Sequence, residues 1–424
     1  MLLFCSKKEN VMSLFSEAEK IYRAWGVDVE NAFRRAAAIP VSIHCWQGDD
    51  VNGFENSGSL DGGLAVTGNY PGRARTPQEL RADIDKVMSL VPGTKRLNVH
   101  ALYAEYDKTG KVERNNITVE NFRNWLDWGK ENNIALDFNP TFFAHPQAAD
   151  GFTLSNADKD IRKYWIEHGI ACRKIAEEFG KAQGTACITN FWVPDGFKDT
   201  PFDREAPRRR LQESLDEIFA VKIDQNYNRD AVESKLFGIG AESCTVGSHE
   251  FYLAYCMKNN KMVCLDAGHF HPTEVISDKI SSVLLFADEL LLHVSRGVRW
   301  DSDHVVTLND ELYAIAQEIL RHNYDKKVHI GLDYFDASIN RIGAWTIGAR
   351  SMQKALLAAA LEPVEALREA EESNDNTARL ALLEDFKTLP LGAMWEAYCE
   401  YCKVPGAGWF DQIREYEKTV LSKR

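Results

Sequence analysis

Short apolar runs alternate with helix-forming segments along most of this chain, and this alternation constrains the fold more than any other feature. The eight apolar runs cover residues 41–46, 96–103, 135–139, 186–193, 234–240, 262–265, 290–294 and 328–333. The helices that follow them are expected at residues 77–91, 118–131, 159–180, 204–222, 249–258, 274–287, 309–322 and 344–361. Strand–helix alternation predicts an α/β fold with a parallel sheet, and eight such units close into a (β/α)8 TIM barrel.

The competing architecture is a doubly wound open sheet, which usually carries a GxGxxG motif after its first strand. No such motif follows residues 41–46. We therefore predict three segments: N-terminal helices at 1–40, the catalytic barrel at 41–361, and a C-terminal helical extension at 362–424. The extension is expected to pack around the outside of the barrel or to contact another subunit.

Charge, hydropathy and cysteine usage limit the partners and the compartment. The formal net charge of -13 argues against a nucleic-acid partner. No apolar run reaches transmembrane length, and the apolar segment before Lys7 and Lys8 is too short for a secretory signal. The nine cysteines are scattered, and we interpret Cys399 and Cys402 as helix residues without a second pair for zinc. We expect reduced cysteines and a cytoplasmic location, with no membrane contact.

A glycine-rich stretch from Gln47 to Pro77 follows the first predicted strand. It contains no phosphate-loop spacing. Loops of this length are usually functional or flexible. We predict that it covers the active site, with a plain flexible insertion as the alternative.

Acidic residues and histidines follow the later apolar runs. In a barrel these positions meet at the carboxyl mouth. The set comprises Glu233, Asp266, His269, His271, His293, Asp301, Asp303, Asp333 and Asp336, and Lys235 lies near them in the sequence. Carboxylates this numerous raise each other's pKa unless cations separate them, and two divalent metals would remove that repulsion. Oxygen and imidazole ligands suit Mn²⁺, Mg²⁺ or Co²⁺. The alternative is that these are unrelated surface residues on loops.

Glu233 is the weak point of this prediction. It precedes the apolar run at 234–240, so it would lie at the wrong end of that strand. A strand that covers about 226–233 instead would place Glu233 at the carboxyl mouth.

Two metals in such a site could hold a polyol and polarise a carbonyl, or they could activate water for hydrolysis. Trp46 and Trp192 lie near two strand ends, where aromatic faces suit a sugar, although core packing is an equal alternative. The open hypotheses are a sugar isomerase, a metal-dependent hydrolase or endonuclease, and a non-catalytic sugar-binding protein.

Several long segments resemble those of the L-rhamnose isomerase family. They are residues 44–50, 232–242, 265–275, 293–296, 299–305 and 331–341, and the resemblance runs from about residue 15 to the end. It implies a metal-dependent aldose–ketose isomerase, usually a homotetramer, built on a (β/α)8 barrel.

The resemblance also implies roles for individual residues. A structural, substrate-anchoring metal would be held by Glu233, Asp266, His293 and Asp333. A catalytic metal would be held by His269, Asp301 and Asp303. The catalytic set is Lys235, Asp333 and His269. His100, Trp46 and Trp192 would contact the sugar, Leu102 would face its methyl group, and His271 and His304 would support the ligands.

The expected reaction interconverts L-rhamnose and L-rhamnulose with Mn²⁺, or alternatively Co²⁺ or Mg²⁺, at two metals per subunit. We expect a 1,2-hydride shift from C2 to C1, with metal-bound water moving the hydroxyl proton. Proton transfer through an enediol remains the alternative, as does an isomerase that prefers another aldose.

Overall fold

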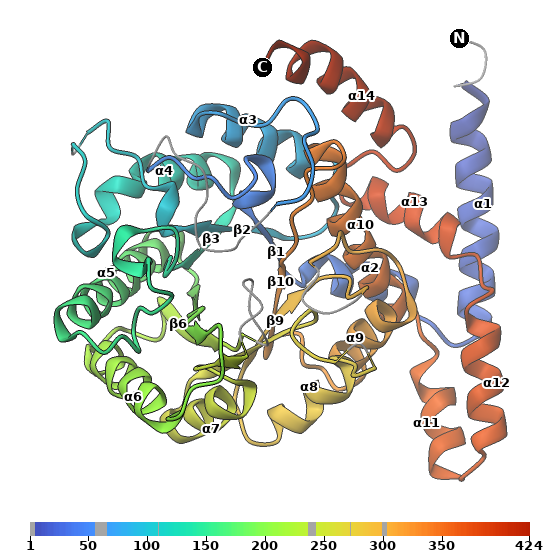
Figure 1. The fold of residues 1–424 in the computed structure, drawn as a ribbon. Helices are drawn as coiled ribbons and strands as arrows, with labels where there is room; N and C mark the ends of the chain where they lie inside the picture. The colour runs from blue at the N-terminus through green and yellow to red at the C-terminus, as the bar shows by residue number, and fades with distance from the viewer. Residues whose placement is uncertain (1–4, 56–65, 109, 236–242, 272, 299–302) are drawn as a thin grey trace.

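The computed structural model of the 424-residue chain describes residues 5–55, 66–108, 110–235, 243–271, 273–298 and 303–424, with side chains from residue 14 onward. Eight parallel strands close into a barrel, which confirms the predicted fold (Figure 1). The barrel strands are β1 Val41–His44, β2 Lys95–His100, β3 Ala135–Asn139, β4 Cys187–Trp192, β6 Asn228–Glu233, β8 Met262–Asp266, β9 Leu290–Val294 and β10 Val328–Leu332. They neighbour one another in this order, and β10 pairs with β1 to close the ring.

Helices surround the barrel at the predicted intervals (Figure 1). They are α3 Pro77–Met88, α4 Arg123–Asn132, α5 Lys159–Gln183, α6 Glu205–Ala220, α7 His249–Asn259, α8 Ser277–Leu284, α9 Asp310–Arg321 and α10 Arg341–Ala360. Local sequence signals set their ends. The hydroxyl of Thr76 accepts a hydrogen bond from the Glu79 amide to begin α3, and Gly184 ends α5 in a left-handed conformation.

Helices from both ends of the chain lie outside the barrel (Figure 1). They are α1 Cys5–Ala24, α2 Val29–Ala38, α11 Val364–Glu372, α12 Asn376–Phe386, α13 Leu391–Tyr401 and α14 Trp409–Thr419. Aromatic contacts join the two ends, because the Tyr22 ring lies 6.1 Å from Phe386 and the Phe33 ring lies 5.6 Å from Tyr398. The extension thus packs on the N-terminal helices. Among the described helices, none combines the length and apolar character needed to cross a membrane.

The two faces of each barrel strand differ in character. Alternate residues such as Leu265 and Leu292 belong to the large apolar core between strands and helices. The apolar cluster inside the barrel is small, and it consists of Ile188, Ala231, Met262, Cys264 and Leu291. The interior therefore leaves room for polar side chains at both ends of the barrel.

The strand predicted at 234–240 is wrong. The barrel strand is β6, which ends at Glu233, and residues 236–242 lie outside the described residues. β6 was not predicted because several of its residues are polar, and the prediction relied on apolar runs. Arg173 and Lys261 both contact Asp230, and this pairing allows a carboxylate to lie in a buried strand. The shift places Glu233 at the carboxyl mouth, as the alternative strand at 226–233 requires.

Two short strands were not predicted. β5 Gly196–Phe197 and β7 Cys244–Thr245 form an antiparallel pair apart from the barrel. Strands of two residues carry no periodic signal in the sequence.

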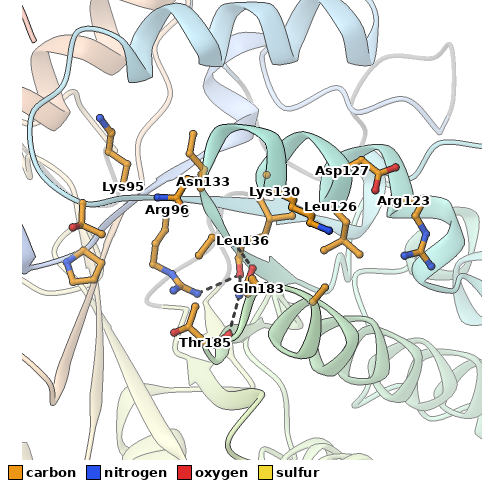
Figure 2. A pocket seen from close by; sticks show the side chains of 16 residues that line it. Lys95, Arg96, Arg123, Leu126, Asp127, Lys130, Asn133, Leu136, Gln183 and Thr185 are labelled. Carbon is orange, nitrogen blue, oxygen red and sulfur yellow. Dashed lines mark hydrogen bonds between the residues drawn. The ribbon is translucent and has the colours of Figure 1, made fainter. Parts of the chain in front are cut away.

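A glutamine side chain joins the amino-terminal ends of β3 and β4. The ladder between these strands is short, with Phe138 paired to Thr189. Gln183 Oε1 accepts a hydrogen bond from the Leu136 amide at 2.7 Å, and Gln183 Nε2 donates to the Leu136 carbonyl at 3.0 Å. Gln183 Nε2 also donates to Thr185 O at 3.1 Å. Figure 2 shows this amide beside a cavity of about 570 Å³ between α4, α5 and the strand ends.

We predict that Gln183→Ala lowers the free energy of unfolding by about 1–3 kcal/mol, because the Leu136 amide and carbonyl lose their partner. Urea denaturation measures the change. Gln78→Ala, at an exposed position of α3, is the matched control and should change stability by less than about 0.5 kcal/mol. Equal stabilities of the two variants would contradict a bridging role for Gln183.

Candidate metal centre and active site

Four buried side chains meet at the carboxyl mouth of the barrel. Glu233 ends β6, Asp266 ends β8, His293 lies on β9, and Asp333 follows β10. One ligand atom from each lies within 4.8 Å of the others. Because these strands are neighbours in the closed sheet, residues far apart in the sequence are brought together.

His293 lies at the centre of this cluster. Its Nδ1 lies 3.2 Å from Glu233 Oε2, 3.0 Å from Asp333 Oδ2 and 3.9 Å from Asp266 Oδ2. Asn190, on the neighbouring strand β4, donates a hydrogen bond from its Nδ2 to Glu233 Oε2. Hydrogen bonds and close packing therefore orient the side chains of the cluster.

The electrostatics of the cluster reflect three carboxylates in a buried space. Burial raises the pKa of Asp266 to about 8; nearby His269 opposes the rise, and the negative charges of Glu233 and Asp333 add to it. Burial alone would lower the pKa of His293, but Cys264 and the carboxylates of Glu233 and Asp333 raise it well above its usual range.

A divalent cation fits this donor set. Three carboxylates and an imidazole offer oxygen and nitrogen ligands at one buried point. Ionised carboxylates confined at one buried point repel one another strongly in low-dielectric surroundings. The cluster could therefore hold a metal ion whose charge replaces protons on these side chains.

A second group of predicted ligands lies beside the first. His269 is buried, and its Nδ1 lies 3.6 Å from Glu233 Oε1. A Cβ placed on Gly268 would lie 3.0 Å from Asp303 Oδ1 and 3.2 Å from Asp266 Oδ1, so these two carboxylates approach the same backbone position. The structure brings His269 and Asp303 next to the cluster. Asp301 lies outside the described residues.

The sequence prediction gave no role to His44, the last residue of β1. Its Nδ1 lies 3.2 Å from Asp333 Oδ1, and its ring centroid lies 4.9 Å from that of His293. Burial opposes the effect, but His44 and His293 together hold the pKa of Asp333 below its usual range. His44 ends β1 as His100 ends β2, so a predicted strand that ends at residue 44 would have identified it.

Aromatic and polar groups continue the wall from His44. The ring centroid of Trp46 lies 4.8 Å from that of His44 and 4.0 Å from that of His100. His100 Nε2 lies 3.3 Å from Asn139 Nδ2. Burial, and then His44, lower the pKa of His100, so its imidazole is neutral near pH 7.

Trp192 and Lys235 lie on the opposite part of the mouth. Trp192 ends β4, directly beside Glu233 in the strand register, and its ring centroid lies 5.7 Å from that of Phe143. Lys235 is buried two residues after β6 and donates a hydrogen bond to Pro194 O at 3.1 Å. Trp192 therefore ends one strand, and Lys235 follows its neighbour, at the rim of the cluster.

Three other candidates lie outside the cluster. His271 and His304 are exposed, and His271 Nδ1 lies 2.7 Å from the hydroxyl of Thr273. Asp336 Oδ1 accepts hydrogen bonds from the amide and hydroxyl of Ser338, so it shapes a turn. The role of the two histidines in supporting the metal ligands stays a prediction.

Part of the glycine-rich loop after β1 is anchored at the mouth. Gln47 exchanges hydrogen bonds with the backbone of Asp336, and Arg341 pairs with Asp50. Leu102, proposed to face a methyl group, is buried against Gly53. Residues 56–65 of the loop lie outside the described residues, so its covering role stays a prediction.

The sequence profile described as RhaA: L-rhamnose isomerase (RhaA) matches residues 9–424. The chain belongs to the L-rhamnose isomerase family. An L-rhamnose isomerase of Rhodopirellula baltica is 60% identical over 98% of this chain and 97% of its own. An L-rhamnose isomerase of Mannheimia succiniciproducens is 60% identical over 98% of this chain and 99% of its own length. An L-rhamnose isomerase of Klebsiella pneumoniae is 59% identical over 96% of this chain and 97% of its own length. The family predicted from the sequence is confirmed.

A solved structure of an L-ribulose 3-epimerase is similar to this chain at 12% identity. The similarity covers 78% of this chain and 97% of that chain, with a TM-score of 0.48. The barrel of this L-rhamnose isomerase family member is therefore assigned from its own strand pairing and not from that likeness.

The raised pKa of Asp266 predicts a pH-dependent stability of the metal-free protein. A carboxyl that binds its proton more tightly when folded contributes stability below its unfolded pKa, near 4, and this stability is lost as pH rises to about 8. Asp266→Asn removes that loss. In EDTA-treated protein we expect the free energy of unfolding of the variant, relative to that of the parent, to rise by up to about 1.4 kcal/mol for each pH unit across this window.

Urea denaturation at pH 5 and pH 8 measures the difference. Gln78→Ala, at an exposed position of α3 without a titratable group, is the control, and its difference from the parent should stay constant with pH. A constant difference for Asp266→Asn as well would show that Asp266 is ionised in the folded chain.

Proposed function

We propose that this chain interconverts L-rhamnose and L-rhamnulose by aldose–ketose isomerisation. The buried cluster of Glu233, Asp266, His293 and Asp333 supports this proposal most strongly. It lies at the barrel mouth of a chain about 60% identical to proteins named L-rhamnose isomerase. A sugar chain in its open form offers the hydroxyl and carbonyl oxygens that a metal in such a site would bind.

The proposed site takes two divalent cations, with Mn²⁺ preferred and Co²⁺ or Mg²⁺ as alternatives. Glu233, Asp266, His293 and Asp333 would hold the cation that anchors the substrate. His269, Asp303 and Asp301 would hold the second. When bound, such cations supply Lewis-acid polarisation of the substrate carbonyl and hydroxyl oxygens.

The surrounding side chains would orient the sugar and exclude water. The neutral His100 imidazole, beside Asn139, would hydrogen-bond a hydroxyl without adding charge. Trp46 and Trp192 would lie along the apolar face of the sugar chain. Lys235, anchored by the Pro194 carbonyl, would offset the negative charge that develops on O1 or O2.

Hydrogen moves between adjacent carbons in the proposed reaction. From aldose to ketose, a hydride passes from C2 to C1, the C2–O bond becomes a carbonyl, and the O2 proton passes to O1. His269 and Asp333 lie beside Glu233 and His293, respectively, where they could hold or orient the moving hydroxyl proton. The atoms of substrate and product balance without an external oxidant.

The family likeness also supports a cytoplasmic homotetramer, with 1–40 and 362–424 as helical segments around the catalytic barrel at 41–361. The contacts between α1, α2 and the C-terminal helices support this division. The eight cysteines with described side chains are free thiols, in agreement with a reducing compartment.

We predict that Glu233→Gln lowers kcat/KM on L-rhamnose by roughly 100-fold or more, since it removes a ligand charge from the cluster. The assay follows ketose formation after chelation, with and without added Mn²⁺. Glu289→Gln is the matched control, because Glu289 pairs with His329 and Arg229 before the start of β9. It should stay within about threefold of the parent.

The assay also separates the alternative functions. No turnover of L-rhamnose but turnover of another aldose would keep the reaction class and change the substrate. No isomerisation of any aldose, with Mn²⁺ bound, would contradict the proposal, and cleavage of nucleic acid or glycosides would then favour a metal-dependent hydrolase.

The hydride shift predicts full retention of the carbon-bound hydrogen. L-rhamnose labelled with deuterium at C2 should give L-rhamnulose with the deuterium at C1, as measured by mass spectrometry and ¹H NMR. An enediol route would exchange deuterium with solvent. Loss of more than about half of the label at low conversion would therefore contradict the direct shift.

A further inference from the structure

A second cavity reaches the metal cluster from the opposite end of the barrel. It has a volume of about 370 Å³. Its outer part is lined by groups at the amino-terminal strand ends, including Glu289 and His329, and its inner part by Asn98, His293 and Gly331. The ring of His293 thus separates this axial cavity from the carboxylate cluster.

The two ring nitrogens of His293 face different surroundings. Nδ1 lies within 3.0–3.9 Å of carboxylate oxygens of Asp333, Glu233 and Asp266. Nε2 is buried and has no hydrogen-bond partner among the described residues. A metal-ligating histidine usually donates its other N–H to a carboxylate, a carbonyl or water. Of these, water is the partner that a cavity can supply.

Gly331 leaves the space for such a partner. A Cβ on Gly331 would lie 3.1 Å from His293 Cδ2 and 3.5 Å from His293 Nε2. Any side chain larger than glycine would therefore press on the imidazole and occupy the inner end of the cavity.

Asn98 supplies an acceptor on the same cavity. Its Nδ2 donates to Asn139 Oδ1 at 3.0 Å, whereas its Oδ1 is buried without a partner among the described residues. Buried polar atoms that lack a protein partner are commonly joined by water, provided that the space is polar and large enough. At about 370 Å³, with Ser42 and Asp137 also in its wall, this cavity meets both conditions.

We propose that the inner end of the axial cavity binds ordered water that accepts the Nε2 proton of His293 and donates, directly or through a second water, to Asn98 Oδ1. With a metal bound, this water would keep the proton on Nε2 and leave the Nδ1 lone pair facing the carboxylate cluster. Gly331 and Asn98 are then positioning residues for the metal centre. The effect on metal binding rests on the proposed function, while the water itself does not.

The first test is a crystal structure of the metal-free protein at about 1.5 Å resolution. We expect a water oxygen about 2.7–3.2 Å from His293 Nε2. A dry inner cavity, or a protein atom at that position, would overturn the proposal. This measurement remains decisive even if the chain binds no Mn²⁺, in which case it is the proposed function that fails.

The second test compares Mn²⁺ affinity by isothermal titration calorimetry. Gly331→Ala should weaken binding by roughly 10–100-fold. Gly392→Ala is the control, because a Cβ there meets nothing within 4 Å, and its affinity should equal that of the parent. Asn98→Ala should weaken binding as well and change the visible spectrum of the Co²⁺-loaded protein, which reports the ligand geometry.

Thermal unfolding of the metal-free variants separates positioning from folding. Weaker Mn²⁺ binding with a Tm within a few degrees of the parent supports the positioning role. Mn²⁺ affinity within threefold of the parent in both Gly331→Ala and Asn98→Ala would overturn it, as would a loss that only follows a large fall in Tm.

Discussion

The confinement of like charges at the carboxyl mouth is the constraint on which this structure depends. Barrel closure places Glu233, Asp266 and Asp333 around one imidazole, in a space from which water is largely excluded. Such an arrangement is unfavourable unless protons or cations balance it. In the metal-free chain the balance falls on the protons of Asp266 and His293, whose pKa values are both raised. A metal would take over this balance.

The rest of the barrel is organised to maintain that confinement. The strongly apolar contacts lie outside the strands, where they fix the ring of helices, and the apolar cluster within the barrel is small. Polar groups fill much of the remaining interior, with Arg96 paired to Asp137 at the amino-terminal end. The small size of the apolar cluster also leaves a cavity behind His293. Both ring nitrogens of His293 can therefore have polar partners.

The sequence was sufficient to predict the barrel and most of the candidate site. Apolar runs such as 262–265 and 290–294 are visible because both faces of these strands are buried. β6 was misplaced because its buried charges, including Asp230, are paired by residues distant in sequence. His44 received no role for a related reason: its importance comes from the pairing of β1 with β10, which brings it to Asp333. The placement of Gln183 between two strands likewise depends on tertiary contacts.

The proposed reaction depends on a divalent metal bound at this cluster, and anomalous X-ray scattering from crystals soaked in Mn²⁺ tests for it most directly. We expect a manganese peak roughly 2.0–2.6 Å from ligand atoms of Glu233, Asp266, His293 and Asp333. A well-ordered cluster without any anomalous peak, at Mn²⁺ concentrations that saturate turnover, would contradict it.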